Sequence, residues 1–137
     1  MGNSQSIIKI NFEDMQGFIN DPDIIIINTM PINNQTCLIV NTINASDETN
    51  ILNELIKLNN LKKIVVYGMN ACDEGIVSKY NQLIKLGFNV YVYPGGLFEW
   101  LLLQDIYGDD SFPTTKKVVD ILQFKGERIS NRLLITY

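Results

Sequence analysis

Residues 62–96 read KKIVVYGMNACDEGIVSKYNQLIKLGFNVYVYPGG and contain a complete strand–helix–strand unit. Two β-branched and aromatic runs, residues 64–67 and 90–93, are too short for helices and are typical of strands buried on both faces. Between them, residues 74–86 repeat apolar side chains with a period of about 3.6, and Gly87 supplies a natural helix end. This order predicts a right-handed βαβ unit with two parallel strands.

The same pattern extends on both sides of this unit. Residues 24–27 are four consecutive isoleucines, residues 7–10 form a short apolar run, and residues 37–40 are a weaker strand candidate. Helices are expected over residues 12–19 with Asn11 as cap, over a stretch that Ser46 caps and whose first turn holds Asp47 and Glu48, and over residues 97–103. Alternating strands and helices predict an α/β fold, a three-layer α/β/α domain around a parallel five-stranded sheet.

Composition excludes several classes of protein. The 137 residues carry 15 acidic and 11 basic side chains, no His and two Cys. A net negative chain with scattered Lys and Arg is not typical of a nucleic-acid binder, because phosphate contacts need clustered basic residues. Without His, common catalytic pairs and zinc sites lack their usual group, so we expect no metal and no cofactor. Two cysteines suit a reducing, cytoplasmic location.

The first six residues, MGNSQS, match a myristoylation signal, with Gly2 as the acceptor and Ser6 as the small hydroxyl residue. A single acyl chain would give weak, reversible membrane contact, because no second anchor lies nearby. The alternative is a flexible polar start, residues 1–6, that matches the signal by chance. The sequence therefore predicts a cytoplasmic protein that is either peripheral on membranes or free of them.

The loop after residues 64–67 is the first candidate site, since ligands of parallel sheets bind beyond the carboxyl ends of the strands. It reads Gly68-Met69-Asn70-Ala71-Cys72-Asp73-Glu74-Gly75 and opens into a helix. Its backbone N–H groups could cradle an anion or stabilise a thiolate at the helix N-terminus. The alternative is that the loop only connects a strand to a helix.

These residues resemble a rhodanese-like domain. The matching segments are VVYGMNACDEG from Val65, LIKLGFNVYVYPGGLFEW from Leu83 and DPDIIIINTMP from Asp21. The resemblance covers residues 7–107, and the segment from Pro94 to Trp100 is its most specific part. It implies the rhodanese fold, with sulfur transfer through a cysteine at the end of the central strand.

Two departures from the family pattern concern function. The sulfur-carrying Cys of the family is replaced by Gly68, and its usual Asp-Val-Arg appears as Asn28-Thr29-Met30. The related phosphatases need a Cys followed by five residues and an Arg, and no Arg precedes Arg128. The resemblance therefore does not extend to a phosphatase, and the usual sulfurtransferase nucleophile is missing.

Cys72 is the remaining candidate for a catalytic thiol, and it has two interpretations. A helix N-terminus favours a thiolate, whereas the adjacent Asp73 and Glu74 disfavour a second negative charge and would also repel thiosulfate. In the other interpretation the two acids cap the helix and Cys72 is a bystander. Cys37 lies in an apolar run and is expected in the core, as is Trp100.

Residues 1–107 are therefore predicted to form the rhodanese-like domain, and residues 108–137 an apolar C-terminal extension that packs on the domain or on a partner. The leading interpretation is a non-catalytic binding or regulatory module for a protein partner. One alternative is a sulfurtransferase that carries a persulfide on Cys72. The other is a structural protein that self-associates, as a homodimer for example, through the C-terminal segment.

Overall fold

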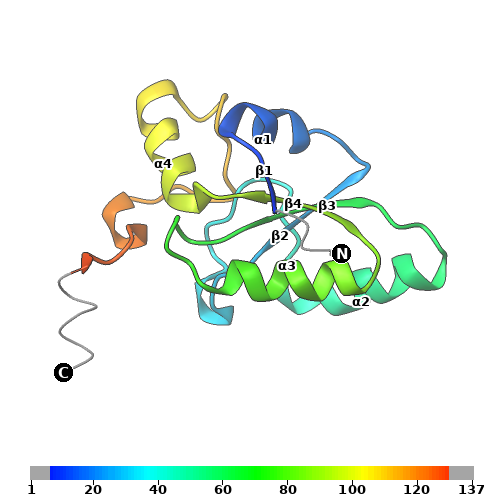
Figure 1. The fold of residues 1–137 in the computed structure, drawn as a ribbon. Coiled ribbons are helices and arrows are strands. Elements are labelled where there is room, and N and C mark those ends of the chain that lie inside the picture. The colour runs from blue at the N-terminus through cyan, green and yellow to red at the C-terminus, as the bar shows by residue number, and fades with distance from the viewer. Residues whose placement is uncertain (1–6, 130–137) are drawn as a thin grey trace.

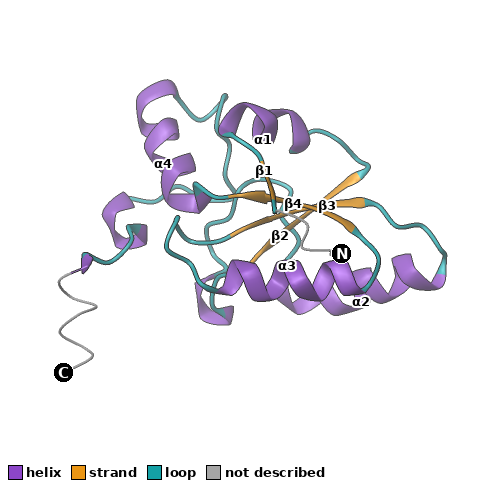
Figure 2. Cartoon of the chain, in the orientation of Figure 1, coloured by secondary structure: helices purple, strands orange, loops and turns teal. Residues whose placement is uncertain are grey.

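The computed structural model describes residues 7–129 (Figures 1 and 2). The expectations for Gly2, for residues 1–6 and for the end of the C-terminal extension lie outside these residues. Strands and helices alternate along the chain: β1 (Ile8–Lys9), α1 (Phe12–Phe18), β2 (Ile24–Asn28), α2 (Ala45–Lys57), β3 (Lys63–Tyr67), α3 (Gly75–Lys85), β4 (Asn89–Tyr93) and α4 (Gly96–Tyr107), with short 3₁₀-helices at Ile32–Asn34 and Ile121–Phe124.

The strands form a parallel sheet in the order β1-β4-β3-β2, with Val65 of β3 aligned between Ile26 of β2 and Tyr91 of β4. Helices α1 and α4 cover one face, and α2 and α3 cover the other (Figure 1). Because successive side chains of a strand point to opposite faces, Val65 packs under α1 and α4 while Val66 packs under α2 and α3. The predicted α/β fold with three layers is confirmed.

The prediction of five strands is wrong, since the sheet of the described chain has four. Residues 37–40 do not join it, because segment 113–115 takes their backbone groups. The Leu38 N–H donates to Thr115 Oγ1 at 3.0 Å, and the Val40 N–H donates to the Pro113 carbonyl at 3.2 Å. A short apolar run becomes a strand only when a sheet edge accepts its hydrogen bonds, and here another segment does so.

The helix ends follow local signals with one exception. Asn11 caps α1 as predicted, in a capping box with Asp14, and Gly87 ends the α3 region with a φ of 97°. The prediction that Ser46 caps the second helix is wrong, because the N-cap position is Asn44, two residues earlier, and Ser46 lies within α2. Asn44 makes no side-chain capping bond, so the residue type at this end does not determine where the helix begins.

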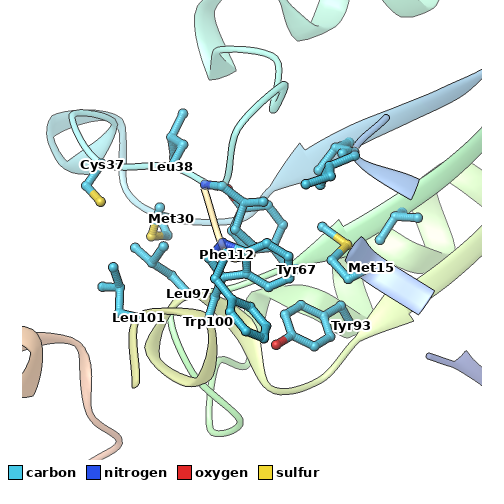
Figure 3. Close-up of a cluster of buried hydrophobic side chains, with 14 of the residues drawn as sticks. Met15, Met30, Cys37, Leu38, Tyr67, Tyr93, Leu97, Trp100, Leu101 and Phe112 are labelled. Atoms are coloured by element: carbon cyan, nitrogen blue, oxygen red, sulfur yellow. The ribbon is translucent and has the colours of Figure 1, made fainter. Parts of the chain in front are cut away.

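An aromatic cluster fills the core under α4 (Figure 3). Trp100 is fully buried, and its ring contacts those of Phe112 and Tyr93 in edge-to-face geometry, with centroids 5.0 Å and 6.1 Å away. Its indole N–H donates to the Pro113 carbonyl at 3.0 Å. The expectation that Trp100 is a core residue is confirmed, and the buried Cys37 is confirmed as one too.

The chain beyond α4 also contributes to this core. Phe112 and Phe124 are 2% and 4% exposed and belong to the same cluster as Trp100. The predicted boundary between a domain and an extension at residue 107 stays a prediction. Among the helices of residues 7–129, none combines the length and the apolar character needed to cross a membrane.

Candidate functional site

Residues 68–75 lie at the carboxyl end of β3, which is flanked in the sheet by β2 and β4. The loop leaves the sheet at Gly68 and enters α3 at Gly75. Thr29, the first residue after β2, lies beside it, because β2 and β3 are parallel neighbours that end at the same edge. The candidate loop therefore occupies the position at which parallel sheets bind their ligands.

The Asp73 carboxylate is at the centre of the loop. Its Oδ2 accepts hydrogen bonds from the Met69 N–H at 3.1 Å and from the Thr29 hydroxyl at 2.9 Å. Its Oδ1 accepts the Gly75 N–H at 2.8 Å. A carboxylate with three donors is well stabilised as an anion. The chain thus supplies its own negative group where an anionic ligand would otherwise be expected.

Gly68 leaves the space that this carboxylate fills. A β-carbon added to Gly68 would lie 2.3 Å from Asp73 Oδ2, 2.6 Å from its Cγ and 2.7 Å from its Cβ. The glycine is not required by its backbone conformation, because its φ is not in the left-handed region. Any side chain at position 68, cysteine included, therefore competes with Asp73 for one volume.

The remaining polar groups of the loop are also largely bonded within the protein. The Cys72 N–H donates to Asn70 Oδ1 at 2.9 Å, and the Asp73 N–H donates to the Asn70 carbonyl at 3.2 Å. Together with the N–H groups of Met69 and Gly75, four loop donors already have partners. An incoming anion would have to displace Asp73 or Asn70 to reach them.

The start of α4 holds the other side of the loop. The Leu97 N–H donates to the Gly68 carbonyl at 2.9 Å, and the Phe98 N–H donates to the Met69 carbonyl at 2.8 Å. Gly96 has a φ of 69°, and a β-carbon there would lie 2.6 Å from the Gly68 carbonyl oxygen. At Gly96 both the conformation and the close approach exclude a side chain, so the tight turn into α4 requires a glycine there.

A second carboxylate lies beside this turn, and the sequence analysis missed it. Glu99 Oε1 accepts a hydrogen bond from the Tyr93 hydroxyl at 2.5 Å. Burial raises the pKa of Tyr93 well above its usual range, and the hydrogen bond and charge of Glu99 raise it further. The phenol therefore stays protonated and serves as a donor. No local sequence signal pairs these residues, because the contact depends on the turn at Gly95 and Gly96.

Cys72 does not occupy the space beside Gly68. Its side chain is exposed and is directed toward Gly126, where an added β-carbon would lie 2.9 Å from Cys72 Sγ. Both residues line a cleft of about 890 Å³ together with Asp73, Glu74 and Lys125. The thiol is therefore accessible from this cleft, but it lies apart from the position that the resemblance assigns to the nucleophile.

The segment that replaces the family's Asp-Val-Arg has a structural role. Asn28 is buried, and its Oδ1 accepts from the Met30 N–H at 3.0 Å and from Gln35 Nε2 at 2.9 Å. Thr29 donates to Asp73, a contact that the sequence did not predict. Within residues 7–129, no three Cys, Asp or Glu side chains gather as metal ligands would.

A smaller cavity of about 430 Å³ lies between α2 and α3 on the other face. The residues that line it include Glu48, which is 8% exposed. Its Oε2 forms an ion pair with Lys79 Nζ at 2.5 Å. Glu48 lies in the first turn of α2, as predicted, and tertiary packing also buries it in an ion pair with Lys79.

Comparisons with known proteins agree with this architecture. The family model of the rhodanese-like domain matches residues 11–103. A crystal structure of a Bacillus halodurans protein superimposes with a TM-score of 0.57 at 19% identity, covering 74% of each chain. One of an Anabaena protein gives 0.55 at 20% identity, covering 93% of this chain and 90% of the other. No curated protein matches the sequence significantly.

Proposed function

The chain belongs to the rhodanese-like domain family, and from this premise we propose that it is a non-catalytic member that acts as a binding or regulatory module. One observation carries the proposal: the Asp73 carboxylate, held by three donors, fills the space next to Gly68 in which the family carries its reactive sulfur. A glycine cannot hold a persulfide. The neighbouring carboxylate also opposes the approach of a dianion such as thiosulfate.

The proposal is tested by a thiosulfate:cyanide sulfurtransferase assay on the full chain. We expect the wild-type rate to equal that of a thiol-free variant, Cys37→Ala with Cys72→Ser, because neither cysteine lies at the family position. Equal thermal unfolding of the two proteins would show that the comparison is between folded chains. A wild-type rate clearly above the thiol-free rate would overturn the proposal.

A second candidate function is supported by the exposure of Cys72. Its thiol is accessible from the cleft, and Lys125 on the opposite wall offers a positive charge for an anionic sulfur donor. In this function the Cys72 thiolate attacks the outer sulfur of thiosulfate, the S–S bond breaks, sulfite leaves, and a persulfide remains on Cys72. Mass spectrometry after thiosulfate treatment would then detect one added sulfur on the peptide that contains Cys72. Absence of this adduct would exclude the sulfurtransferase.

Self-association through the C-terminal segment is the third candidate. Val119, Leu122 and Ile129 are exposed apolar side chains after α4, and such side chains support association with another surface. Truncation at Gly108 would remove Phe112 from the core, so substitution of the exposed Val119 and Leu122 by Ser is the better test. A solution mass twice that of the chain, reduced by these substitutions, is the expected result for a homodimer.

The proposed setting is the cytoplasm, with weak membrane contact if Gly2 is acylated. Co-expression with an N-myristoyltransferase, followed by intact-mass measurement, tests the acylation. Vesicle sedimentation of the acylated chain and of a Gly2→Ala variant then tests the membrane contact. We expect weak, reversible binding that only the acylated chain shows.

A further inference from the structure

Residues 121–127, which follow α4 in the chain, pack against the candidate loop of residues 68–75. Phe124 is 4% exposed and inserts into the core, and its carbonyl accepts a hydrogen bond from Asn70 Nδ2 at 2.8 Å. Two residues later, Gly126 lies against Cys72 so closely that a β-carbon would be 2.9 Å from the sulfur. The 3₁₀-helix Ile121–Phe124 lies beside α4, as the orange segment in Figure 1 shows. One wall of the cleft is therefore this segment, and the other is the loop.

The contacts of this segment resemble those of a peptide bound to a surface. An aromatic anchor is buried, a side-chain amide binds a backbone carbonyl, and a β-carbon on Gly126 would lie 2.9 Å from the thiol sulfur. Lys125 of the segment lines the cleft together with Asp73 and Glu74 of the loop, and Glu127 lines it too. Acidic groups on the receiving surface favour a basic residue at this position.

The segment has the features of an element that can be displaced. It follows the matched residues 11–103 and holds only a single turn of 3₁₀-helix. Phe124 is the one buried apolar side chain of the segment; Val118 and Ile121 pack only partly against the core, Leu122 is 58% exposed and Val119 is fully exposed. Segments with few buried contacts open at low free-energy cost relative to global unfolding.

We propose that the surface formed by residues 69–74 and the start of α4 is a peptide-docking groove, which residues 121–127 fill as a built-in ligand. The partner is a peptide with an aromatic residue followed by a basic residue and a glycine, the order of Phe124-Lys125-Gly126. Partner binding then requires release of the segment. This inference rests on the proposed function as a binding module and adds the class of partner and its regulation.

The experiment uses the full chain and a fluorescent synthetic peptide of residues 119–129. A Gly126→Val variant is expected to displace the segment, because its β-carbon would lie 2.9 Å from Cys72 Sγ and 3.4 Å from Cys72 Cβ. Fluorescence anisotropy should show about tenfold tighter peptide binding to this variant than to the wild type, if the groove of the wild type is free about one-tenth of the time. A peptide with Phe124→Ala should not bind. Gly17→Ala is the matched control, since a β-carbon at Gly17 meets no atom within 4 Å.

The rate at which iodoacetamide alkylates Cys72 is an independent measure of the release of residues 121–127 from the groove. This rate should be higher in Gly126→Val than in the wild type. A Phe124→Ala variant provides a second route to release. Trp100 fluorescence reports whether each variant is folded. Equal peptide affinity for all variants, no binding to a folded variant, or an unchanged alkylation rate would each overturn the inference.

Loss of the folded state in both variants would also overturn it, because the segment would then be an integral part of the core. No sulfur donor is present in these measurements. Their failure would therefore leave the sulfurtransferase assay, and the proposed function itself, unaffected.

Discussion

Substitution of Gly68 by alanine tests whether Asp73 fills the space of the missing side chain. The new methyl group would lie 2.3 Å from Asp73 Oδ2 and 2.7 Å from Asp73 Cβ, so the whole side chain must move. Overpacking of this kind costs about 1–3 kcal/mol. Asp73 would also lose hydrogen bonds from Met69, Gly75 and Thr29, although water replaces part of these at a half-buried carboxylate. We expect Gly68→Ala to lower the free energy of unfolding by about 2 kcal/mol.

The second arm of the test removes Asp73. Asp73→Gly abolishes the three hydrogen bonds and should cost about 2 kcal/mol by itself. In that background, the methyl group of Gly68→Ala meets no Asp73 side chain, and an alanine at a compatible φ is neutral or stabilising by about 0.4–1 kcal/mol. The double variant should therefore lose about 1–2 kcal/mol, rather than the roughly 4 kcal/mol that independent effects would give.

Denaturant unfolding followed by the fluorescence of Trp100, which is fully buried, measures these differences. Gly17→Ala again serves as the matched control, and we expect it to be neutral or stabilising in helix α1. A Gly68→Ala variant as stable as the wild type, or additive effects of the two substitutions, would refute the conclusion that the two residues share one space.

Two further predictions concern buried ionisable groups. Burial raises the pKa of Tyr67 and Tyr93 above the usual value of about 10, so above that pH the unfolded chain binds fewer protons and the free energy of unfolding falls. Denaturant midpoints at increasing pH measure this, and a smaller slope is expected when both are replaced by Phe; no decline would contradict the prediction. Glu48→Gln should cost about 2 kcal/mol, because Lys79 then lacks its partner with only 22% of its side chain exposed. Asp109→Asn, which breaks a largely exposed pair, should change the same measurement by less than about 1 kcal/mol, and equal effects would refute the distinction.

Much of the fold follows from local sequence. The β-branched runs predict β2, β3 and β4, and helical periodicity between them predicts parallel connections, because each signal depends on residues a few positions apart. Asn11 and Gly87 determine helix ends for the same reason. The segment from Pro94 to Trp100 also identifies the family that the comparison with residues 11–103 confirms.

What the sequence did not predict depends on distant contacts. Residues 37–40 have the composition of a strand, but hydrogen-bond partners for them lie in segment 113–115, far along the chain. The sequence places Glu48 in the first turn of its helix, but it does not predict the contact with Lys79, which α3 brings against it. Neither partner can be chosen from local propensity, because it depends on which segments approach each other after the layers assemble.

The sequence by itself determined that position 68 has no side chain and that a loop with Cys72, Asp73 and Glu74 follows the central strand. Only the tertiary structure decided that Asp73 fills the resulting space while Cys72 is directed toward the C-terminal segment. The physical reason is that Thr29, Gly126 and the start of α4 converge on this loop from separate parts of the chain. Their hydrogen bonds and excluded volume select the direction of each side chain.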